Sequence, residues 1–114
     1  MYSLLIIDDE SIVRAGIRTI IRNQGTKFDV IYECCNGLEA LAFLETTRPD
    51  LIITDIRMPG MDGLVFIEKC AAMYPEKPPE IIVLSGHSDF EYARKAMRYG
   101  VKNYLLKPIN RREL

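Results

Sequence analysis

Acidic side chains directly follow two apolar runs of this sequence. The run Ser3–Ile7 ends in Asp8-Asp9-Glu10, and the run Leu51–Thr54 ends in Asp55. Apolar runs without polar alternation are typical of strands that are buried on both faces of a parallel sheet. Open α/β sheets place their chemistry in the crevice beyond the carboxyl ends of such strands. We therefore expect these carboxylates to meet at one edge of a sheet.

Two further strand ends carry complementary polar groups. Ser85 follows the run Ile81–Leu84, and Lys107 follows the short run Tyr104–Leu106. Carboxylates that crowd together repel one another unless they are protonated or paired with a cation. A hard divalent cation relieves this repulsion, and Mg²⁺ suits a site with few carboxylates and open water positions. A carboxylate nucleophile, a metal, a hydroxyl and an ammonium group together indicate phosphoryl transfer to an aspartate.

Each of these groups also has a simpler explanation. Asp8 and Asp9 could form a solvated turn, and Ser85 could cap the segment that follows it. Lys107 could be an exposed charge, which is the usual state of a lysine. Four strand ends with complementary chemistry nevertheless favour one shared site.

The elements that must position these groups alternate between strand and helix five times. Apolar spacing predicts helices after Ser11, over Leu38–Thr47, after Asp62, over Asp89–Tyr99 and from Asn110. This pattern is typical of an α/β fold, a doubly wound five-stranded parallel sheet with helices on both faces. Phe28–Cys34 alternates more than the other strands, which predicts an edge strand. Right-handed crossovers then favour the strand order 2-1-3-4-5.

The first helix carries isoleucines at helical spacing. The residues predicted to form one buried helical stripe are Ile12, Val13, Gly16, Ile17, Ile20 and Ile21. Gly16 costs some helix stability, and we interpret it as a point of close packing on the sheet.

Bulk composition excludes several classes of protein. The 114 residues suffice for one domain, residues 1–114, and the net charge of -1 includes no basic field for nucleic acid. No apolar run approaches the roughly 20 residues of a membrane span. Cys34, Cys35 and Cys70 form no CxxC pair, which favours reduced thiols in a cytoplasmic protein. The fifth helix is expected to be truncated, as in a piece of a longer protein.

Four motifs resemble those of bacterial two-component response-regulator receiver domains, over essentially the whole chain. They are Ile7-Asp8-Asp9-Glu10, Asp55-Ile56-Arg57-Met58-Pro59-Gly60-Met61-Asp62-Gly63, Leu84-Ser85-Gly86 and Leu106-Lys107-Pro108. The resemblance implies a flavodoxin-like receiver fold with Asp55 as the phosphoacceptor. It also implies that Asp8, Asp9 and Asp55 hold Mg²⁺ together with the backbone carbonyl of Arg57.

The same resemblance assigns roles to three other residues. Ser85 and Tyr104 are the expected switch pair, and Lys107 is expected to contact the phosphoryl group. Arg57 and His87 each follow a site residue by two positions, where receivers tune the rate of dephosphorylation. A solvated role for these two side chains stays equally open.

The implied function is a phosphorylation-dependent signalling switch. A sensor histidine kinase would supply the phosphoryl group, and the domain would catalyse only its own phosphorylation and dephosphorylation. Gly86–Ala93 further resembles receivers that are attached to AraC-type DNA-binding domains. This implies a transcription regulator whose output domain lies beyond Leu114 and alone contacts DNA. A homodimer through the face of helix 4, strand 5 and helix 5 is expected, with no membrane partner.

Two alternatives belong to other classes. An aspartate-nucleophile phosphatase of flavodoxin-like fold would need a second acid two residues after the nucleophile, where this chain has Arg57. A flavodoxin-like cofactor binder would need a phosphate-binding loop after the first strand. Asp8-Asp9-Glu10 would repel a phosphate at that position.

Overall fold

The computed structural model describes residues 2–23, 28–55, 61, 63–85, 94 and 103–106, with only the backbone for residue 85 and residues 103–106. The described elements are β1 (Tyr2–Ile7), α1 (Ser11–Asn23), β2 (Phe28–Cys34), α2 (Gly37–Leu44), β3 (Leu51–Asp55), α3 (Gly63–Met73), β4 (Glu80–Ser85) and β5 (Asn103–Leu106). Of the helix predicted over Asp89–Tyr99, only Arg94 is described. The predicted fifth helix lies outside the described residues.

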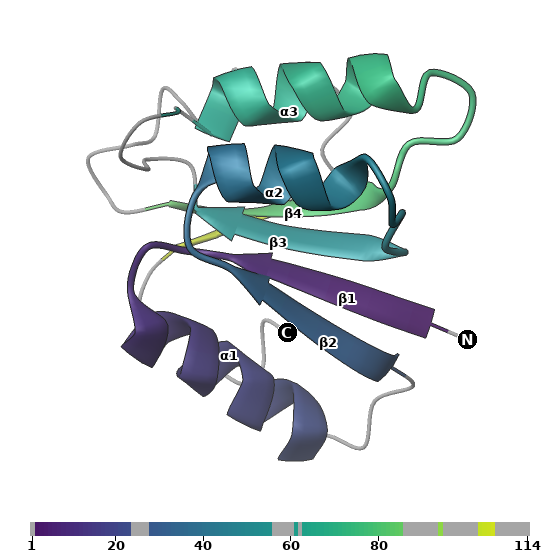
Figure 1. The fold of residues 1–114 in the computed structure, drawn as a ribbon. Helices are drawn as coiled ribbons and strands as arrows, with labels where there is room; N and C mark the ends of the chain where they lie inside the picture. Colours follow the sequence, from purple (N-terminus) through teal and green to yellow (C-terminus); the bar gives the residue numbers. More distant parts are fainter. Residues whose placement is uncertain are drawn as a thin grey trace.

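The five strands form one parallel sheet in the order β2-β1-β3-β4-β5. The predicted strand order is confirmed, and β2 is an edge strand as expected. Helices α2 and α3 cover one face of this sheet, and α1 covers the other (Figure 1). The described part of the chain is therefore a doubly wound α/β fold.

Alternate residues of the central strands enter two separate hydrophobic clusters. Successive side chains of a strand point to opposite faces of a sheet, so a strand with helices on both sides needs apolar residues at every position. The cluster under α2 and α3 contains Leu5, Ile7, Cys34, Ala40, Leu44, Ile52, Phe66, Ile67, Cys70, Ile81 and Val83. The cluster under α1 contains Leu4, Ile6, Ile17, Ile21, Ile53 and Leu84. This arrangement explains the continuous apolar runs of the sequence.

Helix α1 buries a narrower stripe than its sequence predicted. Ile17 and Ile21 are buried, but Ile12 is 85% exposed. Ile12 lies in the first turn of α1, next to the acidic residues at the sheet edge, whereas the other two lie farther along, over the strands. Among the described residues, nothing lies within 4 Å of a Cβ built on Gly16. The predicted close packing at Gly16 is therefore wrong.

The close approach occurs instead at Gly37, the first residue of α2. A Cβ at this position would lie 3.1–3.2 Å from three side-chain atoms of Met61. Asn36 caps the same helix, because its side-chain oxygen accepts a hydrogen bond of 2.8 Å from the backbone N–H of Glu39. At the far end of α2, the Tyr74 hydroxyl donates to the carbonyl oxygen of Leu44. The approach of Met61 to Gly37 and the Tyr74 hydrogen bond thus join α2 to the residues before and after α3.

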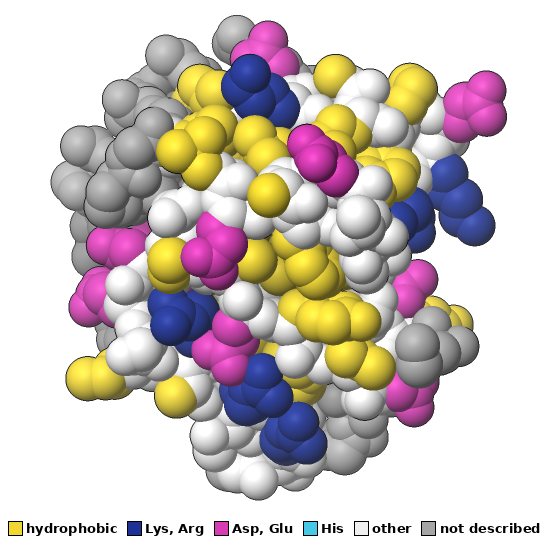
Figure 2. All heavy atoms as spheres, viewed as in Figure 1, with side chains coloured by type: hydrophobic (Ala, Val, Ile, Leu, Met, Phe, Trp, Pro, Cys, Tyr) yellow, Lys and Arg dark blue, Asp and Glu magenta, His cyan; other side chains and the backbone are white. Residues whose placement is uncertain are grey.

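Charged side chains of both signs are interspersed on the face shown in Figure 2. This mixture of charges agrees with the net charge of -1 for the whole sequence. Within the described residues, no helix is long and apolar enough to cross a membrane.

Candidate functional site

The sheet register brings the predicted carboxylates to one edge. Ile7 of β1 pairs with Thr54 of β3, so the next residues along the two parallel strands are Asp8 and Asp55. Asp55 is itself the last residue of β3 and pairs with Leu84 of β4. Both carboxylate residues are buried, with 0% of Asp8 and 6% of Asp55 exposed. The structure thus places two acids on adjacent strands at the carboxyl edge of the sheet.

Hydrogen bonds to its backbone and to its carboxylate hold Asp8 in place. Its backbone N–H donates to the carbonyl oxygen of Cys34 at 3.2 Å, and its carboxylate Oδ1 accepts from the backbone N–H of Glu10 at 2.9 Å. Its own carbonyl oxygen accepts from Nη1 of Arg14 at 2.6 Å. The second carboxylate oxygen, Oδ2, is also buried. Asp8 is therefore an anchored residue, in contrast to the exposed Asp9 and Glu10 that follow it.

The acidic turn provides a group of oxygen ligands for a metal ion. One carboxylate oxygen from each of Asp8, Asp9 and Glu10 lies within 4.8 Å of the other two. A donor set made only of carboxylate oxygens fits a hard divalent cation such as Mg²⁺ and does not fit a thiophilic metal. The turn could therefore hold a metal ion.

The other predicted site residues are described only in part. The backbone of Ser85 ends β4 and pairs with Leu106 of β5, and the backbone of Tyr104 pairs with Val83. Ser85 is thus at the same sheet edge as Asp55. Arg57 and Lys107 lie outside the described residues.

Two residues near the acidic turn were not singled out as site residues from the sequence. Glu10 belongs to the group of possible ligands, and three consecutive acids are a signal that could have found it. Arg14 contacts the carbonyl oxygen of Asp8 through its side chain. No sequence pattern reveals that contact, because it depends on how α1 is placed against the end of β1.

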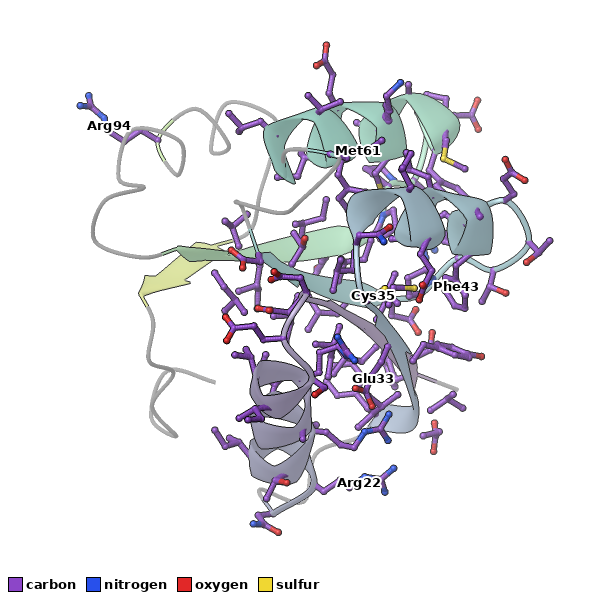
Figure 3. All side chains as sticks on the ribbon, turned by 60° about the vertical axis from the view of Figure 1, so that its left-hand side comes forward. Arg22, Glu33, Cys35, Phe43, Met61 and Arg94 are labelled. Atoms are coloured by element: carbon purple, nitrogen blue, oxygen red, sulfur yellow. The ribbon has the colours of Figure 1, made fainter. Side chains whose placement is uncertain are left out.

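The vicinal cysteines lie beside this edge, at the turn between β2 and α2, where Figure 3 labels Cys35. Sγ of Cys35 donates to Oε2 of Glu39 at 3.1 Å, and its backbone N–H donates to Oε1 at 3.3 Å. The hydrogen bond between the two side chains raises the pKa of the Cys35 thiol and lowers the pKa of the Glu39 carboxyl group. Burial raises the pKa of Cys34 to about 12. Both thiols are free, as predicted, and stay protonated near neutral pH.

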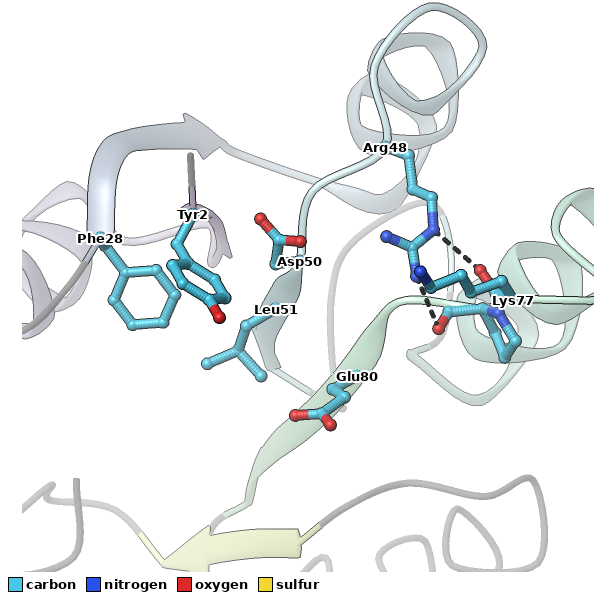
Figure 4. Close-up of a pocket in the computed structure, with 8 residues that line it drawn as sticks. Tyr2, Phe28, Arg48, Asp50, Leu51, Lys77 and Glu80 are labelled. Carbon is cyan, nitrogen blue, oxygen red and sulfur yellow. Dashed lines mark hydrogen bonds between the residues drawn. The ribbon is translucent and has the colours of Figure 1, made fainter.

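A pocket of about 520 Å³ lies at the opposite, amino edge of the sheet (Figure 4). Its lining includes Tyr2, Leu51 and Glu80, which begin β1, β3 and β4. Nε and Nη2 of Arg48, also in the lining, donate to the carbonyl oxygens of Lys77 and Pro78 at 2.8 and 3.1 Å. The guanidinium group therefore holds the loop before β4. This pocket is distinct from the acidic edge.

Proteins similar in sequence are named as transcriptional regulators, and a similar solved structure has the same fold. The chain is 45% identical over its full length to transcriptional regulatory protein YesN of Bacillus subtilis, of which it covers 30%. It is 37% identical to transcriptional regulatory protein HptR of Staphylococcus aureus, of which it covers 44%. A crystal structure of a two component transcriptional regulator AraC from Clostridium phytofermentans superposes with a TM-score of 0.87 at 33% identity. That match covers 99% of this chain and 86% of the other.

The chain spans less than half the length of these two curated relatives, so it corresponds to one part of each. The family model of the response regulator receiver domain matches residues 4–114. This match includes both acidic strand ends and all of the described sheet except the first two residues of β1. The chain belongs to the family of response regulator receiver domains.

Proposed function

We propose that this receiver domain accepts a phosphoryl group on Asp55 from a sensor histidine kinase, in a reaction that requires Mg²⁺. The observation that carries the proposal is the register of β1 and β3, which places Asp8 beside Asp55 at the sheet edge. Asp55 is almost entirely buried, which supports its role as a nucleophile that is shielded from bulk water. The sensor kinase is the partner that a receiver domain of a two-component system implies.

The proposed metal ligands are Asp8, Asp9, Asp55 and the backbone carbonyl of Arg57. The anchored Asp8 would supply a fixed ligand, and the exposed Asp9 would supply an adjustable one. Bound Mg²⁺ would neutralise the charge that gathers on the phosphoryl oxygens during transfer. Without a cation, the neighbouring carboxylates would repel an incoming phosphoryl group.

The transfer step is a displacement at phosphorus. A carboxylate oxygen of Asp55 forms a bond to phosphorus while the bond from phosphorus to the phosphohistidine nitrogen breaks, and that nitrogen keeps the electron pair. The product is an acyl phosphate, and attack by water later returns Asp55 and inorganic phosphate. Lys107 would neutralise one phosphoryl oxygen, and Ser85 would donate its hydroxyl to another. The domain would thus act only on itself and on its phosphodonor.

The proposed output is transcriptional control. The phosphoryl group would draw Ser85 toward Asp55, and Tyr104 would take up the vacated space by a change of rotamer. This would alter the face formed by the helix predicted over Asp89–Tyr99, β5 and the helix predicted from Asn110, through which two copies would associate. YesN and HptR are transcriptional regulators more than twice the length of this chain, and the similar solved structure is that of a regulator named AraC; together they support an AraC-type DNA-binding output domain in the full-length protein.

The proposal is tested by phosphorylation with acetyl phosphate, followed by intact-mass spectrometry. The wild type is expected to gain one phosphoryl group with Mg²⁺ and none with EDTA. Asp55→Asn is expected to gain none under either condition, and Glu68→Gln, a change at an exposed carboxylate on α3, is expected to behave as the wild type. Equal incorporation in the wild type and Asp55→Asn would overturn the proposal.

A further inference from the structure

Arg14 contacts the acidic turn from both sides. Its backbone N–H donates to the carbonyl oxygen of Glu10 at 3.2 Å, and Nη1 of its side chain donates to the carbonyl oxygen of Asp8 at 2.6 Å. The two acceptors flank Asp9. The turn is therefore held at Glu10 by the first backbone hydrogen bonds of α1 and at Asp8 by the side chain of Arg14.

The guanidinium group of Arg14 is itself held by an ion pair. Nε of Arg14 lies 3.1 Å from Oε1 of Glu33, whose other oxygen lies 2.7 Å from Nη2 of Arg18. Nη2 of Arg18 also donates to the carbonyl oxygen of Ile31, so this second arginine ties α1 to β2. Glu33, labelled in Figure 3, thus links α1 to the edge strand. This pairing restricts where the Arg14 side chain can lie.

The Arg14 side chain is more sheltered from solvent than that of Arg18, which pairs with the same Glu33. The Arg14 side chain is 17% exposed, compared with 30% for Arg18. A guanidinium group offers several donors in a rigid planar arrangement, so one arginine can serve a carboxylate and a carbonyl at the same time. A lysine at this position would keep the charge but would offer all its donors from a single nitrogen, without the planar fork.

We propose that Arg14 is a positioning residue for the metal site, fixing the Asp8–Glu10 turn so that the carboxylates of Asp8 and Asp9 converge on one cation. The inference rests on the proposed function, because it assumes that this turn holds Mg²⁺. Groups that orient metal ligands without touching the metal typically change metal affinity 10–100-fold when they are removed.

Charge and geometry act in opposite directions here, which makes the proposal testable. Arg14 brings a positive charge close to a cation site, so removing that charge alone would tighten Mg²⁺ binding. Removing the positioning contact would instead weaken binding. The sign of the change in affinity therefore distinguishes the two effects.

The experiment is isothermal titration calorimetry with MgCl₂ on the wild type, Arg14→Gln, Arg14→Lys and Arg18→Gln. Titrations are run at about 0.1 M and about 1 M KCl, where the screening length falls from about 10 Å to about 3 Å. We expect Arg14→Gln to raise the dissociation constant about tenfold at both salt concentrations. Arg14→Lys keeps the charge, and its dissociation constant is expected to lie between those of the wild type and Arg14→Gln. Arg18→Gln, which removes contacts to Glu33 and Ile31 only, is expected to stay within about twofold of the wild type.

A second readout does not require the metal. Hydrogen exchange at the backbone N–H of Glu10, which donates to Oδ1 of Asp8, reports directly on the order of the turn. Without Mg²⁺, we expect this exchange to be faster in Arg14→Gln than in Arg18→Gln. Thermal unfolding of both variants serves as the check that each is folded.

The outcomes separate this inference from the proposed function. A wild type that binds no Mg²⁺ would count against the proposed function, whereas faster exchange in Arg14→Gln would still support the positioning contact. Tighter binding by Arg14→Gln at low salt would show that only its charge matters. Equal affinity and equal exchange in the Arg14→Gln and Arg18→Gln variants would overturn the inference.

Discussion

The backbone N–H of Asp8 donates a hydrogen bond of 3.2 Å to the carbonyl oxygen of Cys34. This bond lies one residue beyond the last paired positions of β1 and β2, Ile7 and Cys34. Asp8 is therefore still held by the sheet, whereas Asp9 is exposed. The site thus combines one acid fixed by the strand with acids carried on the turn that follows it.

The buried position of Asp8 predicts its effect on Mg²⁺-dependent stability. A ligand that binds only the folded state stabilises it by about 2.7 kcal/mol at 100 times its dissociation constant. Asp8→Asn keeps an oxygen to accept from the Glu10 N–H but removes the charge that the metal needs. We expect Mg²⁺ to raise the free energy of unfolding of the wild type and to have little effect on Asp8→Asn. Urea unfolding with and without MgCl₂ measures this difference.

Glu68→Gln is the matched control for that experiment, because Glu68 is an exposed carboxylate on α3. Its response to Mg²⁺ is expected to equal that of the wild type. An Asp8→Asn variant that Mg²⁺ stabilises as strongly as the wild type would show that the metal binds elsewhere.

The two helical glycines of α1 and α2 predict opposite responses to alanine. Gly16 is exposed, and the described part of the chain leaves room for a Cβ there, so Gly16→Ala is expected to stabilise the fold by about 0.5–1 kcal/mol. Gly37→Ala would place a Cβ within 3.1–3.2 Å of Met61 side-chain atoms. Its free energy of unfolding is therefore expected to be lower than that of Gly16→Ala. Thermal unfolding of the two variants compares them directly. A destabilised Gly16→Ala would mean that close packing occurs at Gly16 after all.

The thiols predict a defined order of reactivity and pH dependence. Only the thiolate reacts rapidly with a disulfide reagent, so a raised pKa moves the rate profile to higher pH. Glu39→Gln removes the charged acceptor that raises the pKa of Cys35. The Cys35 thiol of this variant is therefore expected to react several-fold faster near pH 8 than that of the wild type. Cys34 is expected to stay slow in the folded protein, because it is buried and its pKa is about 12.

This reaction is followed with a chromogenic disulfide reagent. Cys35→Ser is the control, and its fast phase is expected to disappear. An unchanged rate in Glu39→Gln would contradict the role of the carboxylate in holding the proton on sulfur.

Sequence patterns predicted the sheet and the meeting of the acids but not the contacts that hold them. The continuous apolar runs indicated burial on both faces, and parallel strands necessarily end at a common edge, so Asp8 and Asp55 could be brought together. The exposure of Ile12 could not be predicted, because it depends on where α1 passes the edge of the sheet. The reach of Arg14 to the Asp8 carbonyl depends on a side-chain rotamer and on the placement of α1. Residue spacing carries no information on that rotamer or on that placement.

Chemical identification of the phosphorylated residue tests the central claim most directly. Borohydride reduces an acyl phosphate on aspartate to homoserine, and the converted residue is then found by tandem mass spectrometry of peptides. After treatment with acetyl phosphate and Mg²⁺, homoserine is expected at position 55 alone, and none is expected when EDTA is present. Homoserine at Asp8 or Asp9, or equal conversion of Asp55 in EDTA, would contradict a metal-dependent phosphoacceptor at the end of β3.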